Sequence, residues 1–103
     1  MHVIWLLVGC APSIDSAPAK AASAYCKRAE ECSLLQEGER KDSCEPQASE
    51  GFEAMWTQDF CPEGFERKAW SACMDVIQSW DCEDIAAGWV EIGEACDSHT
   101  VCE

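Results

Sequence analysis

Residues 65–80, FERKAWSACMDVIQSW, form the most regular stretch of this chain. Apolar side chains recur there at the spacing that places them on one face of an α-helix. These side chains are Phe65, Ala69, Cys73, Val76, Ile77 and Trp80. The stretch therefore predicts an amphipathic helix that packs on a core, with a cysteine in the middle of its buried face.

Residues 19–36 predict an earlier helix with the same periodicity. Its apolar stripe consists of Ala22, Tyr25, Ala29 and Cys32, which lie three or four residues apart. Gly38 follows in the loop EGERKD, and glycine readily adopts the left-handed conformation that ends many helices. We expect Gly38 to cap this helix.

A helix between these two is predicted to open with Asp42 or Ser43 as its N-cap, because a short side chain with an oxygen accepts hydrogen bonds from the first free amides. Pro46 is tolerated in a first turn, where its missing N–H costs nothing. The segment FCPEG, residues 60–64, ends the helix. The apolar stripe is Cys44, Ala48, Phe52, Met55 and Trp56.

The C-terminal third is less regular. Asp81 is a candidate N-cap for a short helix over residues 82–87, and residues 88–103 predict an irregular tail. No segment alternates with the period of two that marks a strand. The predicted fold class is all-α: a small disulfide-stapled bundle of three main helices, a short fourth helix and an irregular C-terminal tail.

Nine cysteines in 103 residues are typical of a disulfide scaffold in an exported chain. Zinc sites use closely spaced ligands such as C-x₂-C, which are absent here, so we predict no metal and no cofactor. Cys10 stands apart from the rest, and an odd cysteine needs another role. The eight cysteines predicted to form disulfides are Cys26, Cys32, Cys44, Cys61, Cys73, Cys82, Cys96 and Cys102.

The pairing follows only weakly from geometry. Cys26 and Cys32 lie about 9 Å apart along one helix, which exceeds the Cα separation that a disulfide spans. Each must therefore reach another element. If the three main helices are antiparallel neighbours, the favoured pairs are Cys26–Cys73 and Cys32–Cys44, which leaves Cys61 and Cys82 to pair with Cys96 and Cys102.

The N-terminus carries a short apolar run, residues 3–8, which is too short to span a membrane. It ends in Leu7-Val8-Gly9-Cys10, which resembles the bacterial lipobox. The resemblance implies signal cleavage between Gly9 and Cys10 and attachment of a diacylglyceryl group to the Cys10 thiol. Ala11, in place of Asp, resembles an outer-membrane sorting pattern.

On this hypothesis residues 1–9 are an incomplete signal peptide, 10–19 a lipidated tether and 20–103 the disulfide-rich helical domain. No Lys or Arg precedes Cys10, and a start codon placed too far downstream explains this departure. An alternative is a secretory signal cut after Ala17-Pro18-Ala19, which would leave a secreted chain. A cytosolic chain with an apolar N-terminus is a third possibility, which the cysteine content disfavours.

The net charge is −13, and almost all of it lies in residues 44–103, where fourteen Asp and Glu residues face only Arg67 and Lys68. This field repels nucleic-acid phosphates, so no nucleic-acid partner is expected. Solubility is the simplest explanation of the charge. A surface that attracts a basic protein or divalent cations is the alternative.

No catalytic residue stands out. His99 has no free cysteine to activate, and nothing marks Ser98 as its nucleophile. The stretch 81–84, DCED, lacks the order of a calcium-binding loop, and helix capping explains Asp81 and Asp84. We interpret Trp70 as part of the core or of its edge, and the alternative is that it forms the wall of a ligand-binding groove. We therefore predict that the protein is not an enzyme.

The order Y-C-x₅-C, then isolated cysteines, W-D-C-E-D and a closing C-x₅-C is similar to the small cysteine-rich predicted lipoproteins of the myxobacterial type. That resemblance implies no activity. The sequence predicts a non-catalytic lipoprotein of the bacterial cell envelope, anchored through Cys10, and the sorting pattern predicts the outer membrane. The alternative is a secreted helical binding or inhibitor module.

Overall fold

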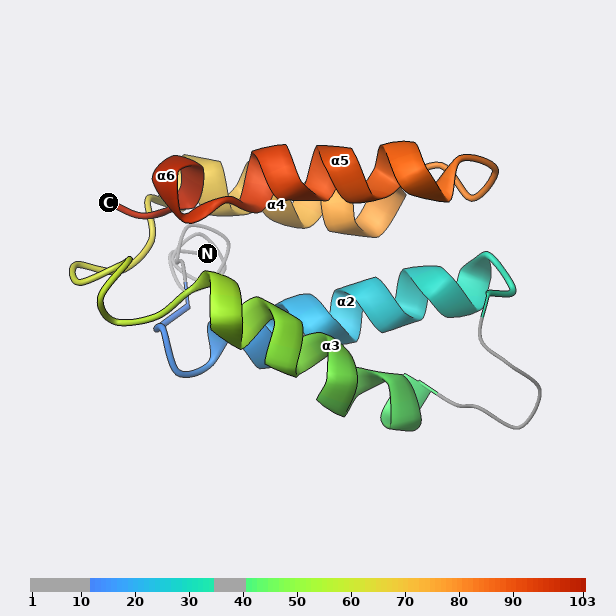
Figure 1. The fold of residues 1–103 in the computed structure, drawn as a ribbon, viewed down its shortest axis with the longest axis horizontal. Coiled ribbons are helices and arrows are strands. Elements are labelled where there is room, and N and C mark those ends of the chain that lie inside the picture. Colours follow the sequence, from blue (N-terminus) through green and yellow to red (C-terminus); the bar gives the residue numbers. More distant parts are fainter. Residues whose placement is uncertain (1–11, 35–40) are drawn as a thin grey trace, which may run out of the picture.

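A computed structural model describes residues 12–34 and 41–103. It contains α2 (Ala17–Glu31), α3 (Lys41–Met55), α4 (Arg67–Ser79), α5 (Ile85–Cys96) and α6 (Ser98–Val101). Figure 1 shows two antiparallel hairpins, α2–α3 and α4–α5, stacked as two layers. No strand occurs in the described ranges, and the all-α fold class is confirmed.

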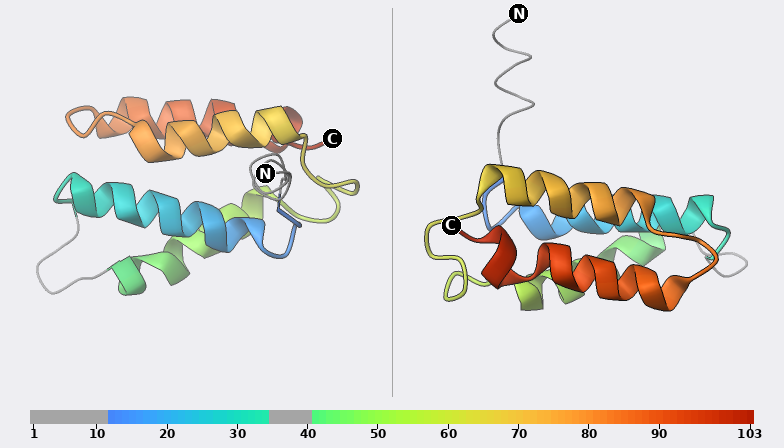
Figure 2. Two further views of the ribbon diagram at one scale, coloured as in Figure 1. Left: turned by 180° about the vertical axis from the view of Figure 1, so that it is seen from behind. Right: turned by 90° about the horizontal axis from the view of Figure 1, so that it is seen from above.

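Helix α2 is the centre of this arrangement, because it packs on α3 within its own layer and on α4 in the other. Helices α3 and α5 scarcely approach each other. In Figure 1 and in the left view of Figure 2, α3 slopes away from α5 toward its own N-terminal end. The bundle is therefore closed along α2 and α4 and splayed between α3 and α5.

Helix α2 is shifted toward the N-terminus relative to the predicted residues 19–36. It begins at Ala17, inside the stretch expected to be tether, and Ile14 already packs against the core. It ends at Glu31, where Cys32 is the C-cap and Ser33 takes a positive φ of 57°. Gly38, the expected cap, lies outside the described residues.

Helix α3 also begins earlier than predicted, at Lys41. Asp42 and Ser43, the expected N-caps, are therefore inside the helix, and Pro46 falls in its second turn. A proline at this position removes one backbone hydrogen bond of the helix, so the sequence alone favours a helix that begins closer to Pro46.

The largest correction concerns the C-terminal third, which is helical rather than irregular. Asp81 does not cap a helix over 82–87. Its carboxylate accepts from the Glu83 amide, while Asp84 caps α5 by accepting from the Ala87 amide at 3.1 Å. The buried residues of α5 are Gly88, Ile92 and Cys96.

These residues recur at every fourth position, so they form one helical stripe. The first of them is a glycine, which has no side chain and therefore gives no hydrophobic signal in the sequence. The glycine has a packing role. A Cβ built on Gly88 would lie 3.1 Å from Trp80 Cβ and 3.2 Å from Trp80 Cε3. Helices α5 and α4 approach closely at this point because no side chain separates them.

One end of the bundle is filled by an aromatic cluster. Trp56 is 1% exposed and contacts the rings of Phe52, Phe65 and Trp70 at centroid distances between 5.1 and 5.5 Å. Its Nε1 donates to the Cys96 carbonyl oxygen at 2.7 Å. Trp70 is buried within this cluster and belongs to the core.

The eight cysteines form four disulfides. Two lie within the hairpins, Cys26–Cys44 joining α2 to α3 and Cys73–Cys96 joining α4 to α5. The other two lie at opposite ends of the bundle, and they are Cys32–Cys82 and Cys61–Cys102.

Both favoured pairs, Cys26–Cys73 and Cys32–Cys44, are therefore wrong. Cys82 bonds to neither cysteine of the C-terminal pair, whereas Cys61–Cys102 is one of the alternatives that the sequence left open. The shifted helix ends explain the difference. Because α3 starts at residue 41, Cys44 faces Cys26 in mid-helix at a Cα distance of 5.9 Å.

Candidate functional site

The splayed side of the bundle contains an apolar groove of about 400 Å³, within the size range of ligand sites. Helix α3 forms its long wall, α5 the opposite wall, and Tyr25 of α2 contributes from the side. The α3 wall runs from Cys44 to Met55, a length of about 16 Å or three helical turns. The α5 wall consists of Trp89, Ile92 and Gly93.

The floor of the groove is core and its rim is exposed. Phe52 and Ile92 are 5% and 3% exposed, whereas Trp89 is 52% exposed. The Trp89 ring is held against Tyr25 at a centroid distance of 5.1 Å, and Tyr25 in turn stacks on Trp80 at 5.8 Å. The indole is thus fixed at the edge of the groove and still faces solvent.

The groove narrows toward the aromatic cluster. Trp56, just after α3, is hydrogen-bonded to Cys96 at the end of α5, which ties the two helices together there. At the other end α3 is bonded to α2 by Cys26–Cys44 and slopes away from α5 (Figure 1). The groove is therefore a wedge whose shape is set by a hydrogen bond at one end and a disulfide at the other.

Two glycines keep the groove open. Gly51 on α3 and Gly93 on α5 line it from opposite sides, and a Cβ at either position would meet nothing within 4 Å. Glycine inside a helix is less stable than alanine by about 1 kcal/mol. Unlike Gly88, neither has a neighbour in this structure that excludes a side chain.

The apolar surface continues beyond the groove along α5. Ile85 and Val90 are 41% and 59% exposed, next to Trp89. Helix α5 thus presents apolar side chains to solvent on one face and to α4 on the other. Exposed apolar patches often mark interaction sites in proteins.

The lining of the groove is mostly apolar. The polar side chains of its lining are the Tyr25 hydroxyl and the Gln47 amide, and burial raises the pKa of Tyr25 above its usual value. The lining supplies no carboxylate, imidazole or free thiol. Within the described residues there is also no cluster of three side chains suited to a metal ion.

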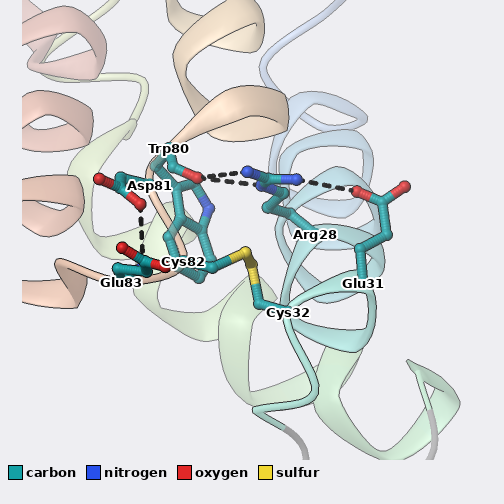
Figure 3. Close-up of a disulfide and its surroundings, with 7 residues drawn as sticks. All are labelled: Arg28, Glu31, Cys32, Trp80, Asp81, Cys82 and Glu83. Carbon is teal, nitrogen blue, oxygen red and sulfur yellow. Dashed lines mark hydrogen bonds and ion pairs between the residues drawn. A yellow bond between two sulfur atoms is a disulfide. The ribbon is translucent and has the colours of Figure 1, made fainter.

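A second polar contact joins the two hairpins (Figure 3). Arg28 donates to the Trp80 carbonyl oxygen from Nε at 3.0 Å and from an NH₂ group at 2.7 Å. Its guanidinium also pairs with Glu31 at 3.4 Å. The Cys32–Cys82 disulfide lies alongside, so the end of α4 is bound to α2 by a covalent bond and two charge-assisted hydrogen bonds.

The other candidate residues from the sequence lie away from the groove or outside the described residues. His99 and Ser98 lie in the one-turn helix α6, near the Cys61–Cys102 disulfide. Gly9 and Cys10, the predicted cleavage and lipidation residues, lie outside the described residues. Among the helices that the structure describes, none is long and apolar enough to cross a membrane.

Sequence analysis missed the groove because its parts look like core or loop. Phe52 and Met55 belong to the predicted core stripe of α3, and Trp89 falls in the segment expected to be irregular. The available signal was the pair of large apolar residues Trp89-Val90 in a strongly acidic region.

Comparisons with curated proteins and with solved structures give no significant match. Residues 26–103, which contain all eight paired cysteines and both walls of the groove, match a family of unknown function, DUF6184. The chain belongs to the DUF6184 family.

Proposed function

We propose that this protein is a non-catalytic lipoprotein of the bacterial cell envelope that is anchored through Cys10 and binds a partner in the groove between α3 and α5. One observation carries the anchor. The eight cysteines from Cys26 to Cys102 are all paired, so Cys10 is the odd cysteine of the nine. It stands in the lipobox-like Leu7–Cys10, and outer-membrane sorting is proposed from Ala11.

The four disulfides support an oxidising compartment, which the envelope provides and the cytosol does not. The lining of the groove supports binding rather than catalysis, because it offers aromatic and aliphatic contact area without a nucleophile or a general base. In this proposal the lipid holds the domain at a membrane and the disulfides keep the groove in shape.

The secreted alternative requires cleavage after Ala19, inside α2. Such a cut would remove Ala17, whose side chain is fully buried, together with the first turn of the helix. Cleavage before Cys10 leaves α2 and its preceding turn at Ser13–Ser16 intact. The position of the first helix therefore favours the lipoprotein over the secreted form.

The anchor is tested by growing cells with a labelled fatty acid and comparing the wild type with Cys10→Ser. We expect label and membrane association in the wild type and neither in the variant. Cys102→Ser is the matched control, since it also removes one cysteine and should keep the label. Equal labelling of the wild type and Cys10→Ser would refute the anchor.

A mass measurement separates the two exported forms. The lipoprotein gives a mature N-terminus at a lipid-bearing Cys10, and the secreted form gives an unmodified chain beginning at Lys20. The same sample should show no thiol that reacts with an alkylating reagent under denaturing conditions, because every remaining cysteine is paired. Two or more reactive thiols would contradict the oxidising compartment.

A further inference from the structure

We infer that the groove between α3 and α5 binds a basic, amphipathic helix of a partner protein. The inference rests on the proposed binding function and names the chemistry of the partner. The shape of the groove supports it first. Its α3 wall is three helical turns long, and helix-binding grooves take apolar side chains spaced over about that length.

The position of the groove supports the same occupant. Helix α2 packs on α4 across the two layers, whereas α3 and α5 scarcely contact each other, and α3 slopes away from α5 toward its own N-terminal end (Figure 1). Gly51 and Gly93 leave room on facing walls for side chains from outside. The exposed Ile85 and Val90 extend the apolar contact surface past the groove, as a macromolecular partner requires and a small ligand does not.

Charge selects the partner. Residues 43–66 and 69–103, which supply both walls, contain no Lys or Arg, and exposed glutamates such as Glu50 and Glu94 lie on the same helices. Such a field attracts a basic partner and speeds its association. It repels fatty-acid carboxylates and anionic lipid head groups, and it opposes association with a second, equally acidic copy.

In the complex, one or two apolar side chains of the partner helix would fill the wedge over Phe52 and Ile92, next to the rim indole of Trp89. Lysine or arginine residues flanking them would face Glu50, which lies one turn after Gln47 on the outer side of α3. Apolar anchors then supply the affinity and the acidic walls supply the selectivity.

The test uses the oxidised full chain carrying Cys10→Ser, so the outcome does not depend on whether the anchor exists. The probe is a synthetic helical peptide of about fourteen residues with leucine on one face and lysine on the other. Titration calorimetry and Trp fluorescence measure its binding. A peptide with glutamate in place of lysine and a lysine peptide with scrambled leucine positions are the comparisons.

We expect the lysine peptide to bind at least about tenfold more tightly than either comparison, and more weakly at high salt. Gly93→Leu and Gly51→Leu fill the groove from opposite walls, and each should lower the affinity by about tenfold or more. Ala72→Leu, on the exposed face of α4, is the matched control and should bind as the parent does. Thermal melts verify that each variant is folded.

The effect of local charge is tested by comparing Glu50→Lys with Glu63→Lys, which change the net charge equally. Glu50 lies beside the groove, and Glu63 lies in the loop before α4. The first should weaken binding of the lysine peptide more. Unchanged binding in both leucine variants would place the peptide elsewhere and overturn the inference. Preferential binding of the glutamate peptide or of phosphatidylglycerol vesicles, or self-association in sedimentation experiments, would overturn the proposed partner.

Discussion

Trp56 and Trp89 show how differently the two ends of this bundle use the same residue type. Trp56 is 1% exposed, contacts three aromatic rings and donates a hydrogen bond to the Cys96 carbonyl oxygen. Trp89 is 52% exposed and rests against Tyr25 at the edge of an open groove. The difference lies in the helices around them, which converge at the first tryptophan and diverge at the second.

The size of the side chains between α3 and α5 differs at the two ends. Where α3 ends, the space between the hairpins is filled by the rings of Phe52, Phe65 and Trp70 around Trp56. One to three turns earlier, the groove-lining positions of α3 include Gly51, Ala48 and Cys44, whose small side chains leave the space between α3 and α5 open. We conclude that the filled end supplies stability and that the groove end is held in shape by covalent bonds.

Breaking all four disulfides should have the largest effect. Each bridge contributes about 2–4 kcal/mol, so together they match the entire stability of a typical small domain. We expect the reduced protein to lose its cooperative thermal transition at neutral pH and to keep only partial helix. Circular dichroism melts with and without reductant check this. Sharp melting of the reduced chain near the oxidised midpoint would contradict it.

Truncating Trp56 and Trp89 compares how much the filled end and the groove end each contribute to stability. Trp56→Ala should lower the free energy of unfolding by about 3–5 kcal/mol, because it opens a cavity and leaves the Cys96 carbonyl without its donor. Trp89→Ala should cost about 1 kcal/mol or less, since half of the ring is already in water. Urea unfolding of the oxidised variants measures both. Similar losses would show that the groove end also stabilises the fold.

The sequence predicted the filled end better than the groove. The stripe of α4 from Cys73 to Trp80 and the fact that eight cysteines form disulfides could be inferred, because hydrophobic periodicity and cysteine content are read directly from the sequence. Which cysteine bonds to which could not, because it depends on how the helices are placed. Helix α5 could not be predicted, because one position of its buried stripe is Gly88, which has no side chain, and because Trp89 and Val90 are apolar residues on its exposed side. The groove depends on the angle between α3 and α5, a tertiary property with no periodic signal.

The three glycines in the described helices allow a finer comparison of packed and open positions. Gly88→Ala should be destabilising by about 1–3 kcal/mol, because its Cβ would press on the Trp80 side chain at 3.1 Å. Gly51→Ala and Gly93→Ala should each be stabilising by up to about 1 kcal/mol, since both point into open space. Thermal melts of the oxidised variants decide it. A loss of stability at either groove position would mean that the helices there are closer than described.

The smallest effect should come from Tyr25, the single tyrosine of the chain, which joins the groove to the core. Burial raises its pKa in the folded protein, while the unfolded chain keeps a value near 10. As the pH rises through about 10, the unfolded state loses this proton before the folded state does. The free energy of unfolding should therefore fall with pH in this window.

The same titration reports on the groove. Tyrosinate absorbance of the folded chain should show a pKa above that of the denatured chain. Trp89→Ala should bring it back toward the ordinary value, because the indole is part of what keeps water from the ring. A basic peptide that binds over Tyr25 has two opposing effects, since its cations favour tyrosinate and its apolar face favours the neutral phenol. Trp89→Ala without any change in this pKa would mean that Trp80, and not the edge of the groove, buries Tyr25.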